Sequence, residues 1–108
     1  MLTTEILRDQ DECLEQIIDN EQIVAIYQGK SEWGPRALGN RSIMFDPRNP
    51  GAKSIVNSVK KREPYRPFAC TIMAEHADEY FHMLQLPDSP WMSFAIQCKE
   101  QAHKDIPS

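Results

Sequence analysis

Ile23-Val24-Ala25-Ile26-Tyr27-Gln28-Gly29 contains the longest unbroken apolar run of the chain. The run is short, partly β-branched and closed by a glycine, which is typical of a buried strand. We therefore predict a strand over residues 22–28. No apolar stretch is long enough to cross a bilayer, so we expect no membrane partner.

A helix is predicted directly before this strand, over residues 10–20. Its apolar side chains recur at helical spacing, and Asp9 or Asp11 is placed to cap its first turn. The apolar face consists of Cys13, Leu14, Ile17 and Ile18.

Turn residues and periodicity predict the later elements. We expect Asn49 to cap a helix with Pro50 at its first position. The tail from Lys99 is polar and is expected to lack a closing element. In chain order we expect a loop over 29–41, a short strand over 42–46, a helix over 50–61, an extended segment over 62–67, a strand over 68–73, a short helix over 75–83 and a strand over 91–98. The helix over 50–61 is predicted to bury Ala52, Ile55, Val56 and Val59.

Helices and strands interleave along a chain of 108 residues, which is enough for one small core. This predicts a single α/β domain, with α+β as the alternative. The three cysteines are odd in number and far apart, which argues against a disulfide framework and favours a cytoplasmic location.

Charge is distributed unevenly along the chain. The total of −4 argues against binding of polyanions, yet residues 30–66 carry nine of the twelve basic residues and a net charge of +6. The flanks, residues 1–29 and 67–108, carry −6 and −4. A basic segment rich in turn-forming residues predicts a rigid anion-binding loop. The alternative is a solvated basic face that balances acidic neighbours.

Two familiar kinds of site are not predicted. Gly29-Lys30-Ser31 follows a strand as a P-loop would, but Val24 occupies the position where that motif needs its first glycine. His76 and His82 have no nearby cysteine, so we predict no metal site and interpret them as surface or helix-end residues, with a shared metal as the weaker alternative.

Two basic motifs carry the functional prediction. Residues 29–43, GKSEWGPRALGNRSI, place Arg36 and Arg41 on a bent loop with Asn40 as a neutral donor. In residues 60–69, KKREPYRPFA, a helix end accounts for the first cations but not for Arg66, which lies between two prolines. Cations fixed on rigid backbone suit a polyphosphate or an acyl phosphate.

In this order and spacing, the motifs resemble the C-terminal, YrdC-like domain of the carbamoyltransferase family, which includes nodulation and antibiotic-modifying O-carbamoyltransferases. The resemblance covers about residues 23–81 and continues more weakly to about residue 106. It implies a twisted mixed sheet with flanking helices. It also implies that residues 1–108 form one partial domain, the N-terminal part of that YrdC-like domain.

The resemblance further implies an activity. Enzymes of this family use ATP and carbamoyl phosphate to form carbamoyl-adenylate with release of pyrophosphate, and Mg²⁺ would bridge the ATP phosphates. A separate N-terminal, actin-like domain with its own metal then passes the carbamoyl group to a hydroxyl. By match to the motifs, Lys60 and Arg66 are the expected catalytic residues. The expected substrate- and nucleotide-binding residues are Arg36, Asn40, Arg41, Lys60, Arg62 and Arg66.

Without the actin-like domain, we expect this segment to be inactive alone. Two other functions stay open: a nucleic-acid-binding module, and a non-catalytic interaction segment whose exposed sheet edge or apolar face is covered by a partner or by self-association. The basic block contains only Trp33 and Tyr65 as exposed aromatic candidates, which argues against nucleic acid.

Overall fold

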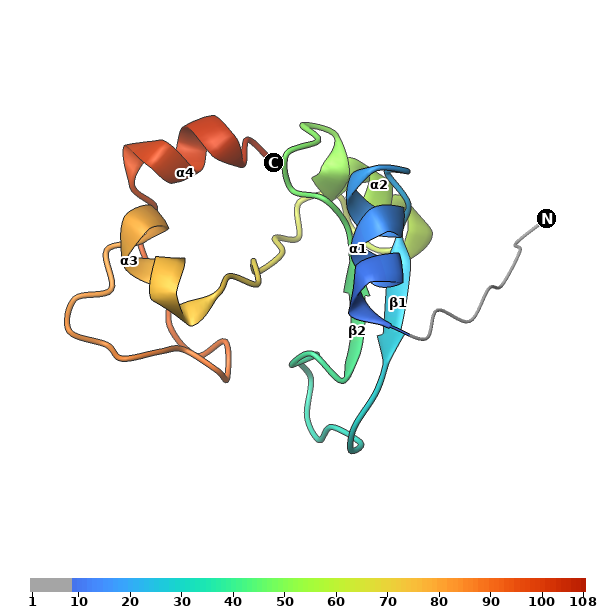
Figure 1. The fold of residues 1–108 in the computed structure, drawn as a ribbon, viewed down its shortest axis with the longest axis horizontal. Coiled ribbons are helices and arrows are strands. Elements are labelled where there is room, and N and C mark those ends of the chain that lie inside the picture. The colour runs from blue at the N-terminus through green and yellow to red at the C-terminus, as the bar shows by residue number, and fades with distance from the viewer. Residues whose placement is uncertain (1–8) are drawn as a thin grey trace.

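The computed structural model describes residues 9–108 (Figure 1). Helices and strands interleave, so the predicted combination of both in one small domain is confirmed. The elements are α1 (Gln10–Ile18), β1 (Val24–Tyr27), β2 (Arg41–Met44), α2 (Ala52–Val59), the 3₁₀ helix η1 (Ala74–His76), α3 (Ala77–Tyr80) and α4 (Glu100–Asp105).

The apolar run over residues 23–27 forms β1, as predicted. It pairs antiparallel with β2 in a register that sets Val24 opposite Met44 and Tyr27 opposite Arg41. Within residues 9–108 the sheet consists of this pair alone, so the mixed sheet implied by the resemblance is not formed there. The reason is that two further predicted strands find no ladder partner.

Helix α1 confirms the prediction for residues 10–20 and packs on β1. The Asp9 side chain caps it by accepting a hydrogen bond from the Glu12 N–H at 2.8 Å. Ile17 is buried, whereas Leu14 and Ile18, predicted for the same face, remain exposed. Only a narrow stripe of α1 therefore contacts the sheet.

The predicted start of the next helix is wrong. Helix α2 begins at Ala52, and Gly51 takes the cap position instead of Asn49. The Asn49 carboxamide oxygen accepts the Gly51 N–H at 2.8 Å, which makes a turn before the helix rather than a cap on it.

The predicted buried face of α2 is also partly wrong. Ala52 and Val56 are buried, but Ile55 and Val59 are 39% and 56% exposed. The inward position goes to Asn57, which is 2% exposed. The helix is thus rotated so that the polar side chain of Asn57 faces inward.

The predicted strands over 68–73 and 91–98 are wrong. Residues 68–73 form the extended connection between the two halves of the ribbon in Figure 1. The second segment makes one isolated antiparallel bridge, Phe81 to Cys98, and the positive φ of 52° at Met92 interrupts the extended backbone that a strand needs.

The last part of the chain is more ordered than predicted. The short helix expected over 75–83 forms as η1 and α3, which end at Tyr80. The expectation that nothing closes the chain after Lys99 is wrong, because α4 follows and packs against α3. Ala102 is 1% exposed, so burial of this small residue anchors α4.

The hydrophobic core is thin. The radius of gyration is 14.6 Å, against about 13 Å for a compact domain of this length. All three cysteines are free thiols, and no helix within residues 9–108 is long and apolar enough to cross a membrane. The buried apolar residues are Ile17, Val24, Ala52, Val56 and Ala102.

Candidate functional site

The first basic motif is a loop whose base continues the β1–β2 pairing. The Gln28 N–H donates to the Asn40 carbonyl at 3.0 Å, one step beyond the last strand pair. The Gln28 side chain donates to the Gly39 carbonyl, also at 3.0 Å. The sheet itself therefore fixes the two ends of the loop.

Glu32 organises the interior of this loop. Its carboxylate accepts the Leu38 N–H at 3.0 Å and the Asn40 N–H at 2.9 Å. These backbone hydrogen bonds, first that from Asn40 and then that from Leu38, lower the pKa of Glu32. Glu32 is an acidic residue in a basic segment of the sequence, and in the structure it holds the loop backbone.

Two glycines permit the path of the loop. Gly29 has φ of +56°, and a Cβ there would lie 2.6 Å from the Asn40 side-chain oxygen. Gly39 has φ of +107°, and its N–H donates to the Ser42 hydroxyl at 3.0 Å. Asn40, predicted as a ligand donor, therefore lies against the loop backbone.

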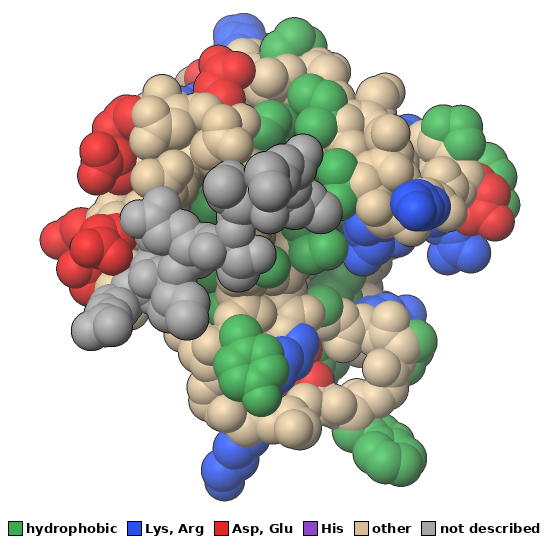
Figure 2. All heavy atoms as spheres, turned by 90° about the vertical axis from the view of Figure 1, so that its right-hand side faces the viewer, with side chains coloured by type: hydrophobic (Ala, Val, Ile, Leu, Met, Phe, Trp, Pro, Cys, Tyr) green, Lys and Arg blue, Asp and Glu red, His purple; other side chains and the backbone are tan. Residues whose placement is uncertain are grey.

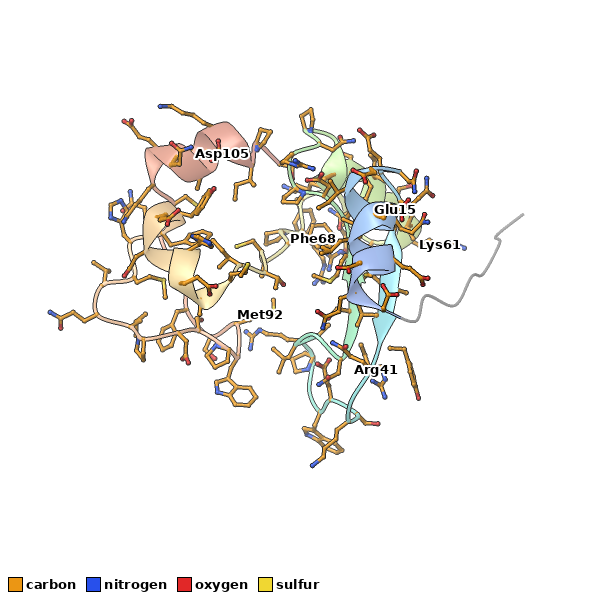
Figure 3. All side chains as sticks on the ribbon, viewed as in Figure 1. Glu15, Arg41, Lys61, Phe68, Met92 and Asp105 are labelled. Atoms are coloured by element: carbon orange, nitrogen blue, oxygen red, sulfur yellow. The ribbon has the colours of Figure 1, made fainter. Side chains whose placement is uncertain are left out.

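Arg41 also serves the loop in this structure. Its guanidinium donates to the carbonyl of Gln28 and, at 2.9 Å, to that of Asn40. It stacks 3.7 Å from the ring centre of Tyr27, its partner across the sheet. Figure 3 shows Arg41 at the lower end of the hairpin.

Residues 33–37 form the exposed tip of this loop, beyond the hydrogen-bonded residues at its two ends. Trp33 is 99% exposed. Arg36 is exposed and has no hydrogen-bond or ion-pair partner among residues 9–108. The structure thus separates the two predicted loop arginines: Arg41 braces the backbone, and Arg36 is available to a ligand.

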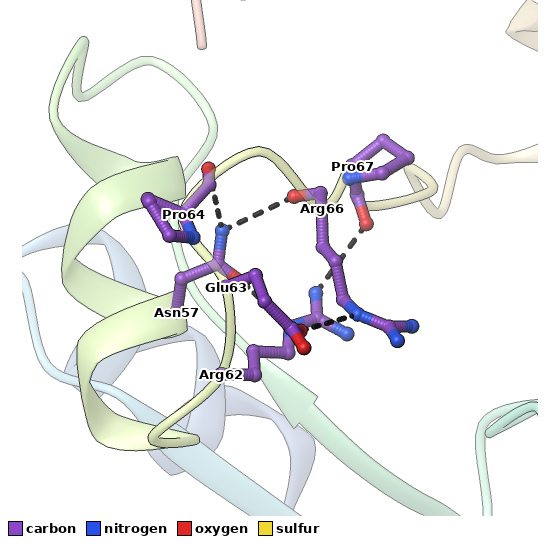
Figure 4. A network of polar contacts seen from close by, with 6 residues as sticks. All are labelled: Asn57, Arg62, Glu63, Pro64, Arg66 and Pro67. Atoms are coloured by element: carbon purple, nitrogen blue, oxygen red, sulfur yellow. Dashed lines mark hydrogen bonds and ion pairs between the residues drawn. The ribbon is translucent and has the colours of Figure 1, made fainter.

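The second basic motif folds around the buried side chain of Asn57 (Figure 4). Its amide nitrogen donates to the Pro64 carbonyl at 3.3 Å and the Arg66 carbonyl at 3.1 Å. Its oxygen accepts from the Arg62 Nε. This network explains why α2 turns a polar residue inward. Both the nitrogen and the oxygen of the buried Asn57 amide have hydrogen-bond partners, as buried polar groups require.

Arg62 is held by several contacts at once. Besides Asn57, its guanidinium donates to the Pro67 carbonyl at 3.4 Å and lies 4.3 Å from the ring centre of Phe68. Like Arg41, this predicted ligand residue braces the chain in this structure.

Arg66 and Lys60 are more accessible. Arg66 donates to the Glu63 carboxylate at 2.8 Å, and both side chains are about half exposed. The pKa of Glu63 is lowered, mainly by a hydrogen bond to its own backbone and then by Arg66. The exposed Lys60 side chain has no partner in the part of the chain that the structure describes.

Arg48, another member of the basic block, is structural. Its guanidinium forks onto the Asp46 carboxylate, with the shortest distance 2.6 Å, in the turn between β2 and α2. This hydrogen-bonded ion pair lowers the pKa of Asp46, which is a buried residue.

The two motifs occupy different parts of the hairpin half of the molecule. In Figure 3, Arg41 lies at the lower end of the hairpin, whereas Phe68 and Lys61 lie well above it. No hydrogen bond or ion pair joins the two motifs within residues 9–108. That both face one ligand site therefore remains a prediction.

The surface reflects the uneven charge of the sequence. In Figure 2, most visible acidic side chains gather at the upper left, while Lys and Arg side chains lie mainly at the right and at the bottom. Helix α1 contributes acids in its first turn and no base in its last. Acidic side chains thus predominate on one side of this face, with a few beside the basic ones.

The loop and the turn each hold a guanidinium group against backbone carbonyls. The chain belongs to the carbamoyltransferase family, because residues 15–108 match the family model for the carbamoyltransferase C-terminus. The family resemblance stated from the sequence is confirmed.

The chain is similar to several known proteins. The chain is 49% identical over 83 residues to nodulation protein NolNO of Sinorhizobium fredii, covering 72% of this chain and 12% of that protein. It is 48% identical over 86 residues to nodulation protein NolO of Bradyrhizobium diazoefficiens, covering 75% and 15%. It is 43% identical over 61 residues to a 3'-hydroxymethylcephem-O-carbamoyltransferase of Streptomyces clavuligerus, covering 56% and 12%. The chain thus spans about an eighth to a seventh of the length of these relatives.

Proposed function

We propose that this chain contributes phosphate-binding residues to the site where an O-carbamoyltransferase combines ATP with carbamoyl phosphate. The observation that supports this most directly is the division of labour among the arginines. Arg41 and Arg62 brace two backbone segments, and these segments present Arg36, Arg66 and Lys60 to solvent. A backbone already held in place presents these charges to a phosphate with less reorganisation.

The available groups fit phosphate rather than a bare metal ion. The carboxylates of the two motifs, Glu32 and Glu63, already accept hydrogen bonds from backbone N–H groups and from Arg66. Mg²⁺ would therefore be carried by ATP, where it neutralises part of the triphosphate charge. Arg36, Lys60 and Arg66 would bind the remaining phosphate oxygens.

In the proposed reaction, water cleaves carbamoyl phosphate to carbamate and inorganic phosphate, and a carbamate oxygen then attacks the α-phosphorus of ATP, which forms carbamoyl-adenylate and releases pyrophosphate. Transfer of the carbamoyl group to a hydroxyl acceptor then takes place on a separate actin-like domain. We also propose that the protein acts together with that domain and its hydroxyl acceptor in the cytoplasm. Self-association also stays a proposal, supported by the large apolar side chains that remain exposed.

Titration calorimetry with Mg²⁺-ATP, and separately with carbamoyl phosphate, tests the assignment. We expect Arg66→Ala and Lys60→Ala to weaken binding about tenfold or more, because a charge-assisted hydrogen bond contributes about 1.5–3 kcal/mol. Lys53→Ala removes an exposed lysine of the same helix outside the motif and is the matched control. The proposal is wrong if a full-length carbamoyltransferase carrying these residues binds both compounds equally well after Arg66→Ala.

One observation favours a nucleic-acid-binding alternative. Trp33 and Tyr65 belong to the two basic motifs and are strongly exposed, and exposed aromatic rings can stack on bases. A gel-shift assay over a range of salt concentrations discriminates the two functions. A nucleotide pocket is expected to show little affinity for duplex RNA, whereas a nucleic-acid interface should bind it with steep salt dependence.

A further inference from the structure

We infer that Glu32 is a positioning residue: its carboxylate fixes the loop tip so that Arg36 is presented to phosphate. This inference rests on the proposed function, because it names the group that orients one of its binding residues. Glu32 itself points into the loop and acts only through the backbone.

The first support is the completeness of the bonding at the exit of the tip. Three successive backbone N–H groups, those of Leu38, Gly39 and Asn40, find side-chain acceptors within the same loop. Glu32 supplies two of these acceptors and Ser42 the third. Backbone N–H groups need partners, so this arrangement defines the path of the chain after Arg36.

The second support is where Glu32 lies in the sequence. It precedes the exposed tip, and the residues it binds follow the tip, so its carboxylate bridges residues 33–37. Without this bridge, the sheet contacts between Gln28 and Asn40 would be the next closure of the loop. A longer unconstrained segment has more conformations, and Arg36 would sample them.

The third support is that the chemistry requires a carboxylate. Each oxygen of an ionised carboxylate only accepts hydrogen bonds, whereas a glutamine amide offers one oxygen and one donating NH₂ group. Both Glu32 oxygens face the Leu38 N–H at 3.0 Å. In Glu32→Gln, one of these contacts would become donor against donor, or the amide would turn away.

The experiment uses the 108-residue chain and two variants that each convert a carboxylate to an amide. Glu32→Gln tests the bridge, and Glu15→Gln changes an exposed carboxylate of α1 as the matched control. Amide hydrogen exchange is measured at Leu38 and Asn40. We expect about tenfold or faster exchange in Glu32→Gln and no change in Glu15→Gln. Unchanged exchange in Glu32→Gln would overturn the inference.

A second readout connects the loop to the ligand. The affinity for Mg²⁺-ATP is measured from pH 7 down to the range below 4.5 in which Glu32 titrates, and each variant is compared with the parent chain so that titration of ATP cancels. The parent chain and Glu15→Gln are expected to lose affinity as Glu32 becomes protonated. Glu32→Gln is expected to bind several-fold more weakly at pH 7 and to lack this additional pH dependence. Arg41 is the charged group that acts on the Glu32 carboxylate.

The outcomes separate this inference from the proposed function. Faster exchange with unchanged ATP affinity would refute the positioning role and leave the binding proposal intact. If the parent chain binds neither ATP nor carbamoyl phosphate, the proposed function fails for this chain, and so does the claim that Glu32 presents Arg36 to phosphate. Exchange at Leu38 would then still decide whether Glu32 orders the tip.

Discussion

The loop over 29–40 and the turn over 60–67 both hold an arginine against backbone carbonyls, but they do so by different means. In the loop, an ionised and partly accessible carboxylate, Glu32, accepts backbone N–H groups. In the turn, a buried neutral amide, Asn57, binds carbonyls and an arginine. The first arrangement is built on a titratable carboxylate and leaves its tip exposed, whereas the second is built on a buried neutral amide.

The largest effect is expected from removing the buried amide. Asn57→Ala deletes three hydrogen bonds at a position that is 2% exposed, and it leaves polar groups of the 62–67 turn without partners. We expect a loss of about 2–4 kcal/mol in the free energy of unfolding, measured in urea. Asn49→Ala, which removes one hydrogen bond at a half-buried turn, is the control and should cost about 1 kcal/mol. Equal losses for both would contradict the central role of Asn57.

A smaller loss is expected at the partner of this amide. Arg62→Met keeps a long apolar stem but removes the guanidinium bonds to Asn57 and Pro67 and the contact with Phe68. We expect about 1–2 kcal/mol of destabilisation by the same measurement. The neighbouring exposed Lys61→Met should change stability little. A neutral Arg62→Met would mean that the turn is held without its guanidinium.

The weakest of these stability effects is expected on the loop side. Tyr27→Leu removes the ring on which Arg41 stacks at 3.7 Å while keeping an apolar side chain on β1. We expect about 0.5 kcal/mol, because the contact is largely exposed. Tyr65→Leu removes an exposed ring elsewhere and serves as control. A loss above that for Arg62→Met would reverse the ranking of the two regions.

Lowering the pH should change the loop over 29–40 without unfolding the chain. The pKa of Glu32 is lowered from 4.5 by backbone hydrogen bonds, so its contribution is complete above that value and is lost as pH falls through the lowered pKa. We expect the amide NMR signals of Leu38 and Asn40 to shift over this range. Glu63 in the turn also has a lowered pKa and pairs with Arg66, so the comparison is made in Glu63→Gln. In that variant the side-chain amide signal of Asn57 should stay in place, and simultaneous shifts in both regions would show that they are coupled.

The sequence predicted the elements that rest on local patterns. The apolar run over 23–27 and the periodic face of 10–20 appear as β1 and α1, because short-range spacing decides them. The strands expected over 68–73 and 91–98 are absent from residues 9–108, since a strand needs a partner that periodicity alone does not supply.

The sequence predicted which arginines belong to the candidate site, but not what each of them contacts. Charge and motif spacing identified the arginines, yet Arg41 and Arg62 bind backbone while Arg36 remains available. Glu32 and Asn57 were missed because their function depends on which carbonyls and N–H groups the fold brings near. The sequence carried no signal for Asn57, because its neighbours one helical turn away, Lys53 and Lys61, are charged.

The long connection between β1 and β2 also bears on how the chain folds. Pairing across residues 28–40 is local in sequence, and such low contact order favours rapid folding. Closing a loop nevertheless costs entropy, with about 0.6 kcal/mol for each doubling of its length. If the Glu32 bridge forms early, it divides this closure into a short inner step and a short outer one. Glu32 would then influence the rate at which β1 and β2 pair, as well as the position of Arg36.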